Sequence, residues 1–206
     1  MRIRNLALVL LLALLPACAP MIMVGGAATG VLVAEDRRST GTLVDDQNIE
    51  VKAGIQVNRQ HRDLVHINIT SYNRNVLLTG EAPTAAVRAD IEKIVAGIEN
   101  VRGVVNEIAV AGASSFGTRT NDSYITSKVK AGFVTAQKFY PGHVKVVTES
   151  GVVYLLGKVL RQEADDATEI ARGVGGVQKV VRVFEYVVLA PTPPPTPAPP
   201  PGKTGA

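Results

Sequence analysis

The spacing of apolar residues predicts an amphipathic helix over residues 121–138. Four apolar residues recur there at intervals of three or four positions and form one buried stripe: Ile125, Val129, Phe133 and Ala136. Asn121 or Asp122 can accept the free N–H groups of the first helical turn. We expect this helix to open the second of two similar folded units.

Two parts of the chain repeat one another. Three blocks align in the same order, the middle one with a slip of one residue: 45–54 with 121–130, 75–80 with 152–157, and 94–108 with 170–184. Such an ordered match indicates an internal duplication, in which each copy forms one supersecondary unit.

Each copy predicts the same order of elements. After the first helix, residues 65–70 and 144–149 alternate in the manner of a strand with one face in a core, which leaves His66 on the outward face. A turn, a second strand, a second helix and a last strand follow, and Gly157 is expected to close its strand with a positive φ. The predicted fold class is α+β: two domains, each αββαβ, with two helices packed on a three-stranded mixed sheet.

The expected boundaries divide the chain into five segments. These are a signal peptide (1–17), an acylated N-terminus and flexible tether (18–42), a first domain (43–112), a second domain (113–190) and a proline-rich disordered tail (191–206). The tail cannot form a packed core and should adopt polyproline II structure. It would act as a spacer or reach toward peptidoglycan or a partner.

Residues 1–17 have the pattern of an export signal. A basic start precedes an apolar run (6–15), and LPAC (15–18) resembles the lipobox of bacterial lipoproteins. In such proteins the signal is cleaved and the cysteine is acylated, so Cys18 is the predicted lipidation site. Ala19, rather than Asp, after the cysteine implies a lipid-anchored protein of the outer membrane that faces the periplasm.

The composition favours aliphatic cores and a weak net charge. Hydrophobic residues make up 46% of the 206 residues, but only 4% are aromatic and none is Trp. The formal charge of +4 falls to +2 when Arg2 and Arg4 leave with the signal. Nucleic-acid-binding domains are more often strongly basic and carry stacking aromatics, so no nucleic-acid partner is expected.

A second stripe on the helix at 121–138 places an aromatic ring one turn from an ammonium group. With the lysines around it, this stripe forms the candidate lipid-binding set: Tyr124, Lys128, Lys130, Ala131, Thr135 and Lys138. Arg119 adds positive charge and Asp122 opposes it. We interpret this face as a surface for anionic phospholipid. The alternative is a solvated helix face with one amphipathic Tyr.

The sequence offers no catalytic constellation. His61, His66 and His143 lack the spacing of a metal site, and HExxH, GxSxG and Cys–His patterns are absent. Asp165 and Asp166 are adjacent on a predicted helix, where neighbours point apart and make a poor acid–base pair. We therefore expect no enzyme, no catalytic residue, no metal and no cofactor.

The repeat resembles the bacterial OsmY and nodulation (BON) domain. In that domain a helix leads into Val-x-Gly-Val-x-x-Val, and this chain has VGGVQKV (174–180) and the looser IENVRGV (98–104). With the lipobox and the segments DRRSTGTLVDDQNIEVK and NDSYITSKVK, the chain is similar to dual-BON outer-membrane lipoproteins of the division- and stress-associated, lipid-binding kind.

The resemblance implies a non-enzymatic periplasmic protein that binds phosphatidylglycerol and cardiolipin, supports outer-membrane integrity and can concentrate at division sites. It places the lipid contact on the first helix of the second domain. Tyr124 stands there for the family's exposed aromatic residue, where Trp would anchor more deeply. A second class stays open: a scaffold that binds envelope-assembly, division or peptidoglycan-remodelling proteins.

Overall fold

The computed structural model describes residues 36–62 and 65–188. The predicted signal peptide, Cys18, most of the predicted tether and the proline-rich tail lie outside the described residues.

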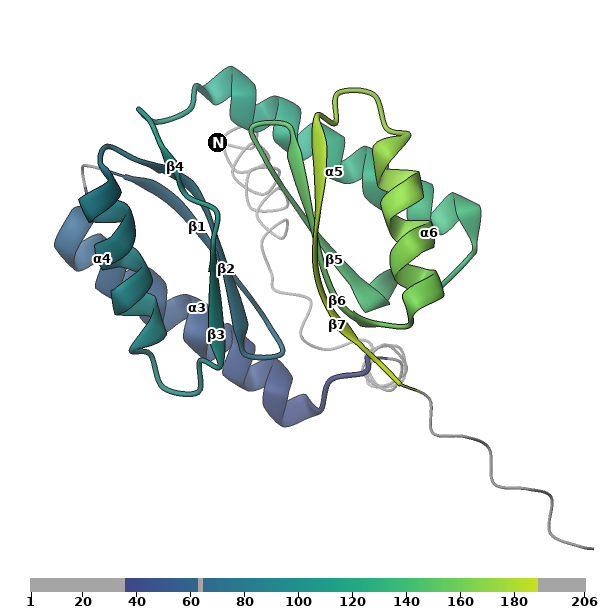
Figure 1. Cartoon of the computed structure of the whole chain (residues 1–206), viewed down its shortest axis with the longest axis horizontal. Helices are drawn as coiled ribbons and strands as arrows, with labels where there is room; N and C mark the ends of the chain where they lie inside the picture. Colours follow the sequence, from purple (N-terminus) through teal and green to yellow (C-terminus); the bar gives the residue numbers. More distant parts are fainter. Residues whose placement is uncertain (1–35, 63–64, 189–206) are drawn as a thin grey trace, which may run out of the picture. The chain divides into compact units, whose positions relative to one another are not determined.

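Two similar domains follow one another along the chain (Figure 1). The first contains α3 (Thr40–His61), β1 (His66–Tyr72), β2 (Asn75–Ala82), α4 (Ala85–Ala96), β3 (Gly103–Asn106) and β4 (Ala109–Val110). The second contains α5 (Phe116–Ala136), the short 3₁₀ helix η2 (Pro141–His143), β5 (Val144–Glu149), β6 (Val152–Val159), α6 (Arg161–Arg172) and β7 (Lys179–Tyr186). The order αββαβ is the predicted one, with the last strand of the first domain interrupted between β3 and β4.

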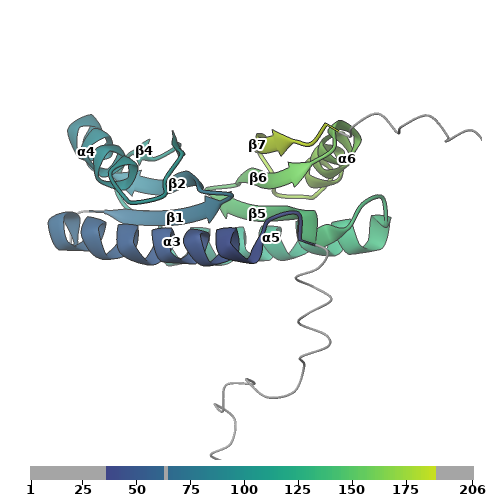
Figure 2. The same cartoon turned by 90° about the horizontal axis from the view of Figure 1, so that it is seen from below.

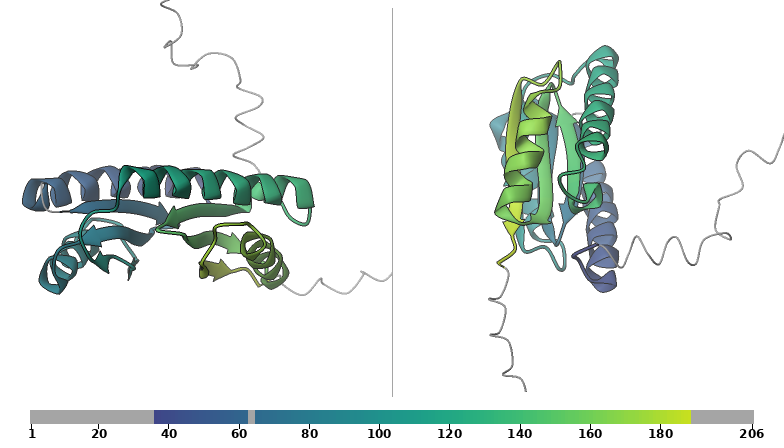
Figure 3. Two further views of the ribbon diagram at one scale, coloured as in Figure 1. Left: turned by 90° about the horizontal axis from the view of Figure 1, so that it is seen from above. Right: turned by 90° about the vertical axis from the view of Figure 1, so that its right-hand side faces the viewer.

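Each sheet is mixed. In the first, β1 pairs antiparallel with β2, and β3 and β4 both pair parallel with β2. In the second, β5 pairs antiparallel with β6, and β7 pairs parallel with β6. The two helices of each domain pack against one face of its own sheet, with α3 along β1 and α5 along β5 (Figures 2 and 3). The predicted fold class is confirmed.

The first helix of each domain is held by one buried stripe. These stripes are Ile49, Ala53 and Val57 in α3, and Ile125, Val129 and Phe133 in α5. Each buried Ile, Val or Phe side chain contributes about 1.5–3 kcal/mol relative to an exposed one. Ala136, predicted as a fourth member of the second stripe, is exposed because α5 ends there. That part of the prediction was wrong.

A buried aspartate on each first helix holds the hairpin of its domain. Both hairpin turns have two successive residues of positive φ, Asn73 and Arg74 in one and Ser150 and Gly151 in the other, as two-residue turns between twisted strands require. The Asp122 carboxylate accepts the N–H groups of Ser150 and Gly151 at 2.8 and 2.9 Å. Asp46 similarly accepts the N–H groups of Asn73 and Arg74, at 2.8 and 2.7 Å.

The predicted helix cap was therefore wrong. The Ser115 Oγ accepts the N–H of Thr118 and caps α5, so the helix begins at Phe116, before Asn121. The carboxylate of Asp122 is directed at the hairpin turn instead. The cap of α3 is Ser39, whose Oγ accepts the N–H of Thr42.

The structural reason for Gly157 also differs from the prediction. Its φ is not positive, but a β-carbon there would lie 2.4 Å from the carbonyl oxygen of His143. Gly80, the counterpart in the first domain, does have a positive φ of 107°, and a β-carbon there would lie 2.0 Å from the carbonyl oxygen of His66. A glycine at either position allows the two hairpin strands to approach closely.

The sheet faces opposite the helices meet one another. Four buried residues from the two domains form a cluster that we call the interdomain seam: Tyr72, Leu77, Tyr154 and Leu156. Polar contacts border it, since Lys145 Nζ lies 2.9 Å from Glu50 Oε1 and Asn68 Nδ2 donates to Glu149 Oε2 at 2.7 Å. The strand face predicted to point outward at His66 is therefore the face turned to the second domain.

Replacement of Asp122 by Ala tests the hairpin contact. Loss of the carboxylate leaves two N–H groups without their acceptor, and we expect the free energy of unfolding to fall by about 1–3 kcal/mol in urea titrations. Asp165→Ala is the matched control, because Asp165 makes an exposed ion pair with Arg182 and should cost at most about 1 kcal/mol. Equal losses in the two variants would contradict this role of Asp122.

Candidate functional site

The candidate site is built on α5. The helix has 21 residues and so extends about 31 Å. Its buried stripe faces β5, and the opposite side is exposed. We call that side the outer face of α5 and define it by six exposed residues: Phe116, Tyr124, Lys128, Ala131, Val134 and Thr135.

Tyr124 and Lys128 form a pair on the outer face. The Tyr124 side chain is 61% exposed, and the Lys128 ammonium lies 5.1 Å from the centroid of its ring. This distance is within the range of a cation–π contact, worth about 0.5–1 kcal/mol at exposed sites. The pair keeps an amphipathic ring and a positive charge together at the surface.

The hydroxyl groups of α5 are largely satisfied within the helix. Thr135 Oγ1 donates to the carbonyl of Ala131 at 3.0 Å. Three other hydroxyls do the same four residues back along the chain: those of Thr120, Ser123 and Ser127. Moving such a surface out of water loses fewer hydrogen bonds than its Ser and Thr content suggests.

Two exposed apolar residues on this face were missed by sequence reasoning. Phe116 is 84% exposed and Val134 is 62% exposed. Phe116 was missed because the helix was predicted to start at Asn121. The sequence signal for this helix start is Ser115, a residue type that favours helix caps. Its Oγ accepts the N–H of Thr118.

The positive charge is smaller than the sequence suggests. Lys138 lies beyond the end of α5, and its Nζ donates to Asp166 Oδ1 at 2.9 Å; this bond raises the pKa of Lys138 and lowers that of Asp166. The Arg119 guanidinium donates to the carbonyl and the hydroxyl of Ser114. Among the described residues, Lys128 and Lys130 are the lysines of α5, and neither has an ion-pair partner there.

Of the six predicted lipid-binding residues, five lie on α5 and are exposed. Tyr124, Lys128, Ala131 and Thr135 share the outer face, and Lys130 lies at its border. Lys138 is exposed but is paired with Asp166 outside the helix.

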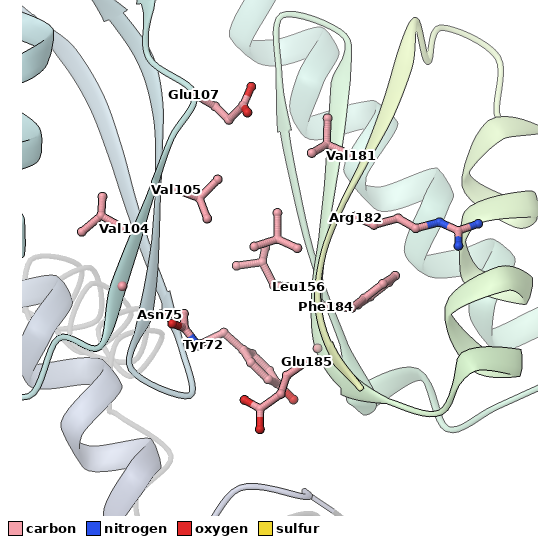
Figure 4. Close-up of a pocket in the computed structure, with 13 residues that line it drawn as sticks. Tyr72, Asn75, Val104, Val105, Glu107, Leu156, Val181, Arg182, Phe184 and Glu185 are labelled. Carbon is pink, nitrogen blue, oxygen red and sulfur yellow. The ribbon is translucent and has the colours of Figure 1, made fainter. Parts of the chain in front are cut away.

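A cleft of about 620 Å³ opens beside the interdomain seam (Figure 4). Val105 and Glu107 of the first domain face Leu156 and Val181 of the second across it. Its lining is more apolar than polar, with Glu107, Arg182 and Glu185 among its members, and we find no nucleophile–base pair among the residues that line it. Nearby, burial and the negative charges of Glu107 and Glu149 raise the pKa of Tyr154 to about 12, so this phenol stays protonated.

The three histidines have different surroundings. His61 Nε2 lies 2.9 Å from Asp90 Oδ2, and His143 Nδ1 lies 3.3 Å from Glu163 Oε1. Within the described part of the chain, His66 forms a group with two carboxylates, those of Glu81 and Glu149. Sequence spacing could not show that group, because its members come from three strands.

Within the described residues, no helix has both the length and the apolar character needed to cross a membrane.

Two αββαβ domains of one sequence pattern define a tandem-repeat α+β protein. A model of the BON domain matches residues 45–112 and 121–187, and the chain belongs to the BON-domain family. The predicted resemblance is confirmed.

Three relatives align with most of the chain. The chain is 36% identical over 167 residues to the outer membrane lipoprotein DolP of Haemophilus influenzae, covering 80% of this chain and 86% of that protein. It is 38% identical over 154 residues to the 21 kDa hemolysin of Actinobacillus pleuropneumoniae, covering 74% and 79%. It is 30% identical over 158 residues to the osmotically-inducible protein Y of Escherichia coli, covering 74% and 78%.

Proposed function

We propose that this chain is a non-enzymatic, lipid-anchored protein of the outer membrane, facing the periplasm, that contacts anionic phospholipid through the outer face of α5. Through that contact it supports outer-membrane integrity during envelope stress or division. Phosphatidylglycerol and cardiolipin are the expected lipids.

The observation that carries this proposal is the composition of the outer face. Tyr124 and Lys128 place a ring and a charge side by side, and Phe116 and Val134 add apolar surface that is 84% and 62% exposed. Aromatic rings favour the boundary between headgroups and acyl chains, and ammonium groups favour anionic headgroups. The internally bonded hydroxyls lower the cost of bringing this surface to the boundary.

The energies assign different roles to the helix and the anchor. Each lysine near an anionic surface contributes about 1 kcal/mol, so Lys128 and Lys130 together contribute roughly 2 kcal/mol before screening by salt. An acyl chain contributes about 0.8 kcal/mol for each buried CH₂ group, and two chains anchor stably. Acylated Cys18 would therefore attach the protein, and α5 would select the lipid that it contacts.

The relatives support the location. The Haemophilus influenzae relative is named an outer membrane lipoprotein, and the match covers 86% of it. The lipobox-like sequence that ends at Cys18 is consistent with the same anchoring in this chain.

A scaffold for envelope proteins is the second candidate. It is favoured by the cleft of about 620 Å³ beside the interdomain seam, whose largely apolar lining suits an apolar peptide side chain better than a headgroup. Such a scaffold would not require anionic lipid.

Co-sedimentation with vesicles tests the lipid contact. We expect the chain without residues 1–18 to pellet with vesicles that contain phosphatidylglycerol more than with phosphatidylcholine vesicles. Tyr124→Ala with Lys128→Glu should lower pelleting several-fold, because about 2 kcal/mol of charge interaction is lost when one lysine becomes an acid. Tyr124→Trp should raise it, because Trp favours the interface more strongly.

The matched control uses a second exposed Tyr–cation pair. The Arg161 guanidinium lies 4.9 Å from the ring centroid of Tyr186, so Tyr186→Ala with Arg161→Glu makes the same kind of change elsewhere. This control should pellet like the unaltered chain. If both double variants lose pelleting equally, net charge explains the loss and the outer face of α5 is not the contact. If pelleting does not depend on lipid charge, the scaffold is favoured.

Replacement of Cys18 by Ser tests the anchor. We expect the full-length variant to leave the outer-membrane fraction of cells and to lose incorporation of labelled palmitate, because the helix alone contributes only a few kcal/mol. Immunoblots of outer-membrane, inner-membrane and soluble fractions provide the measurement. A variant that stays in the outer-membrane fraction would show that acylation at Cys18 is not the anchor.

A further inference from the structure

Strand alternation places three potential metal ligands on the faces that meet between the domains. Ile67 and Ile69 of β1 face the first core, so His66 of the same strand faces the second domain. Glu81 of β2 is the direct cross-strand partner of His66. Glu149 ends β5 in the second domain and approaches the same place, since it accepts a hydrogen bond from Asn68.

The three side chains converge. His66 Nδ1 lies 3.5 Å from Glu81 Oε2, and ligand atoms of His66, Glu81 and Glu149 all lie within 4.8 Å of one another. Two ligand atoms bound to one tetrahedral Zn²⁺ at the usual bond lengths are separated by about 3.4 Å. The separation of the imidazole nitrogen and the carboxylate oxygen is therefore close to that of two atoms that bind the same Zn²⁺ ion.

The two carboxylates of the cluster receive little compensation from the rest of the protein. Glu81 and Glu149 are 5% and 7% exposed, and no Lys or Arg of the described residues pairs with either carboxylate. The hydrogen bonds to these carboxylates come from the backbone N–H of Ser114 and the amide of Asn68. Burying two carboxylates with so few partners is costly unless a cation joins them.

The imidazole nitrogen of His66 is an independent sign of a missing partner. His66 Nδ1 is buried and has no hydrogen-bond partner. Within residues 36–62 and 65–188 it is the one buried side-chain nitrogen or oxygen for which this is so. Buried polar atoms normally have a partner, and an unsatisfied one calls for an ion, a water or another ligand. This nitrogen belongs to the group that faces the two carboxylates.

The surroundings leave room for an ion and its water. A hollow of about 350 Å³ adjoins the cluster and is lined by His66, Glu149, Asp122 and Arg119 among others. The Arg119 guanidinium, the cation of that lining, donates to the carbonyl and hydroxyl of Ser114. Asp122 is held by the N–H groups of the β5–β6 turn.

We propose that His66, Glu81 and Glu149 form a divalent-cation site that joins the two domains, and that Zn²⁺ is the ion that suits it. One imidazole and two carboxylates are Zn²⁺ ligands, with water in the remaining position. The imidazole disfavours Mg²⁺ and Ca²⁺, which prefer oxygen ligands alone. A bound ion would tie β1 and β2 of the first domain to β5 of the second.

Metal titration of the full chain tests the site. The protein, purified without a histidine tag and stripped with EDTA, is titrated with ZnCl₂, and bound metal and the thermal unfolding midpoint are measured. We expect saturation at one Zn²⁺ per chain with a rise in the midpoint, because binding to the folded state alone stabilises it. MgCl₂ and CaCl₂ at the same concentrations should produce neither effect.

Two variants and one control connect the binding to these residues. His66→Ala and Glu149→Gln should each weaken Zn²⁺ binding by at least roughly 10- to 100-fold. Loss of a residue that only hydrogen-bonds to a metal ligand already has an effect of this size. His61→Ala is the control, because His61 pairs with Asp90 outside the proposed site, and it should bind like the unaltered chain. Circular dichroism in EDTA establishes that each variant folds, and if His66→Ala does not fold, the nearly isosteric Glu149→Gln decides.

Either of two results overturns the proposal. One is the absence of saturable Zn²⁺ binding by the unaltered chain. The other is unchanged affinity in the folded Glu149→Gln variant.

Discussion

Burial of Ile125, Val129 and Phe133 against the second sheet fixes the rotation of α5 about its axis. Because side chains three and four positions apart share a helix face, this constraint alone decides which residues face away from the sheet. Tyr124 and Lys128 are exposed because the core holds the other side of the helix. The same constraint turns Phe116 and Val134 outward. Exposed there, their side chains bury little apolar surface and do not stabilise the domain itself.

Because the domains are duplicates, the same aspartate contact holds the hairpin in each. The sheet face that the helices do not cover packs against the corresponding face of the other domain. Asp46 and Asp122 occupy corresponding places and hold corresponding hairpin turns. With helices on one face of each sheet, the opposite faces meet at Tyr72, Leu77, Tyr154 and Leu156. The pairing brings His66 and Glu149, 83 positions apart, within reach of one ion. The contact between the domains can therefore carry chemistry that neither domain has alone.

The order of elements could be predicted because it depends on local periodicity and turn residues, and both copies repeat it. The start of α5 could not, because the oxygens of Asp122 suit a helix cap as well as a hairpin turn, and only the fold decides between them. Lys138 was counted as a free charge because Asp166, its partner, is 28 positions away. The exposed positions of Tyr124, Lys128, Ala131 and Thr135 followed from helix geometry once the buried stripe was known.

The central claim is that the outer face of α5 is the part of this protein that lies against anionic lipid. Amide NMR spectra of the chain, recorded with nanodiscs that contain phosphatidylglycerol and a spin-labelled lipid, test it at each residue. The account predicts line broadening that is strongest for residues near Phe116, Tyr124 and Lys128 and weak in α6 and β7. Broadening centred on α6 or β7, or none at α5, would contradict it.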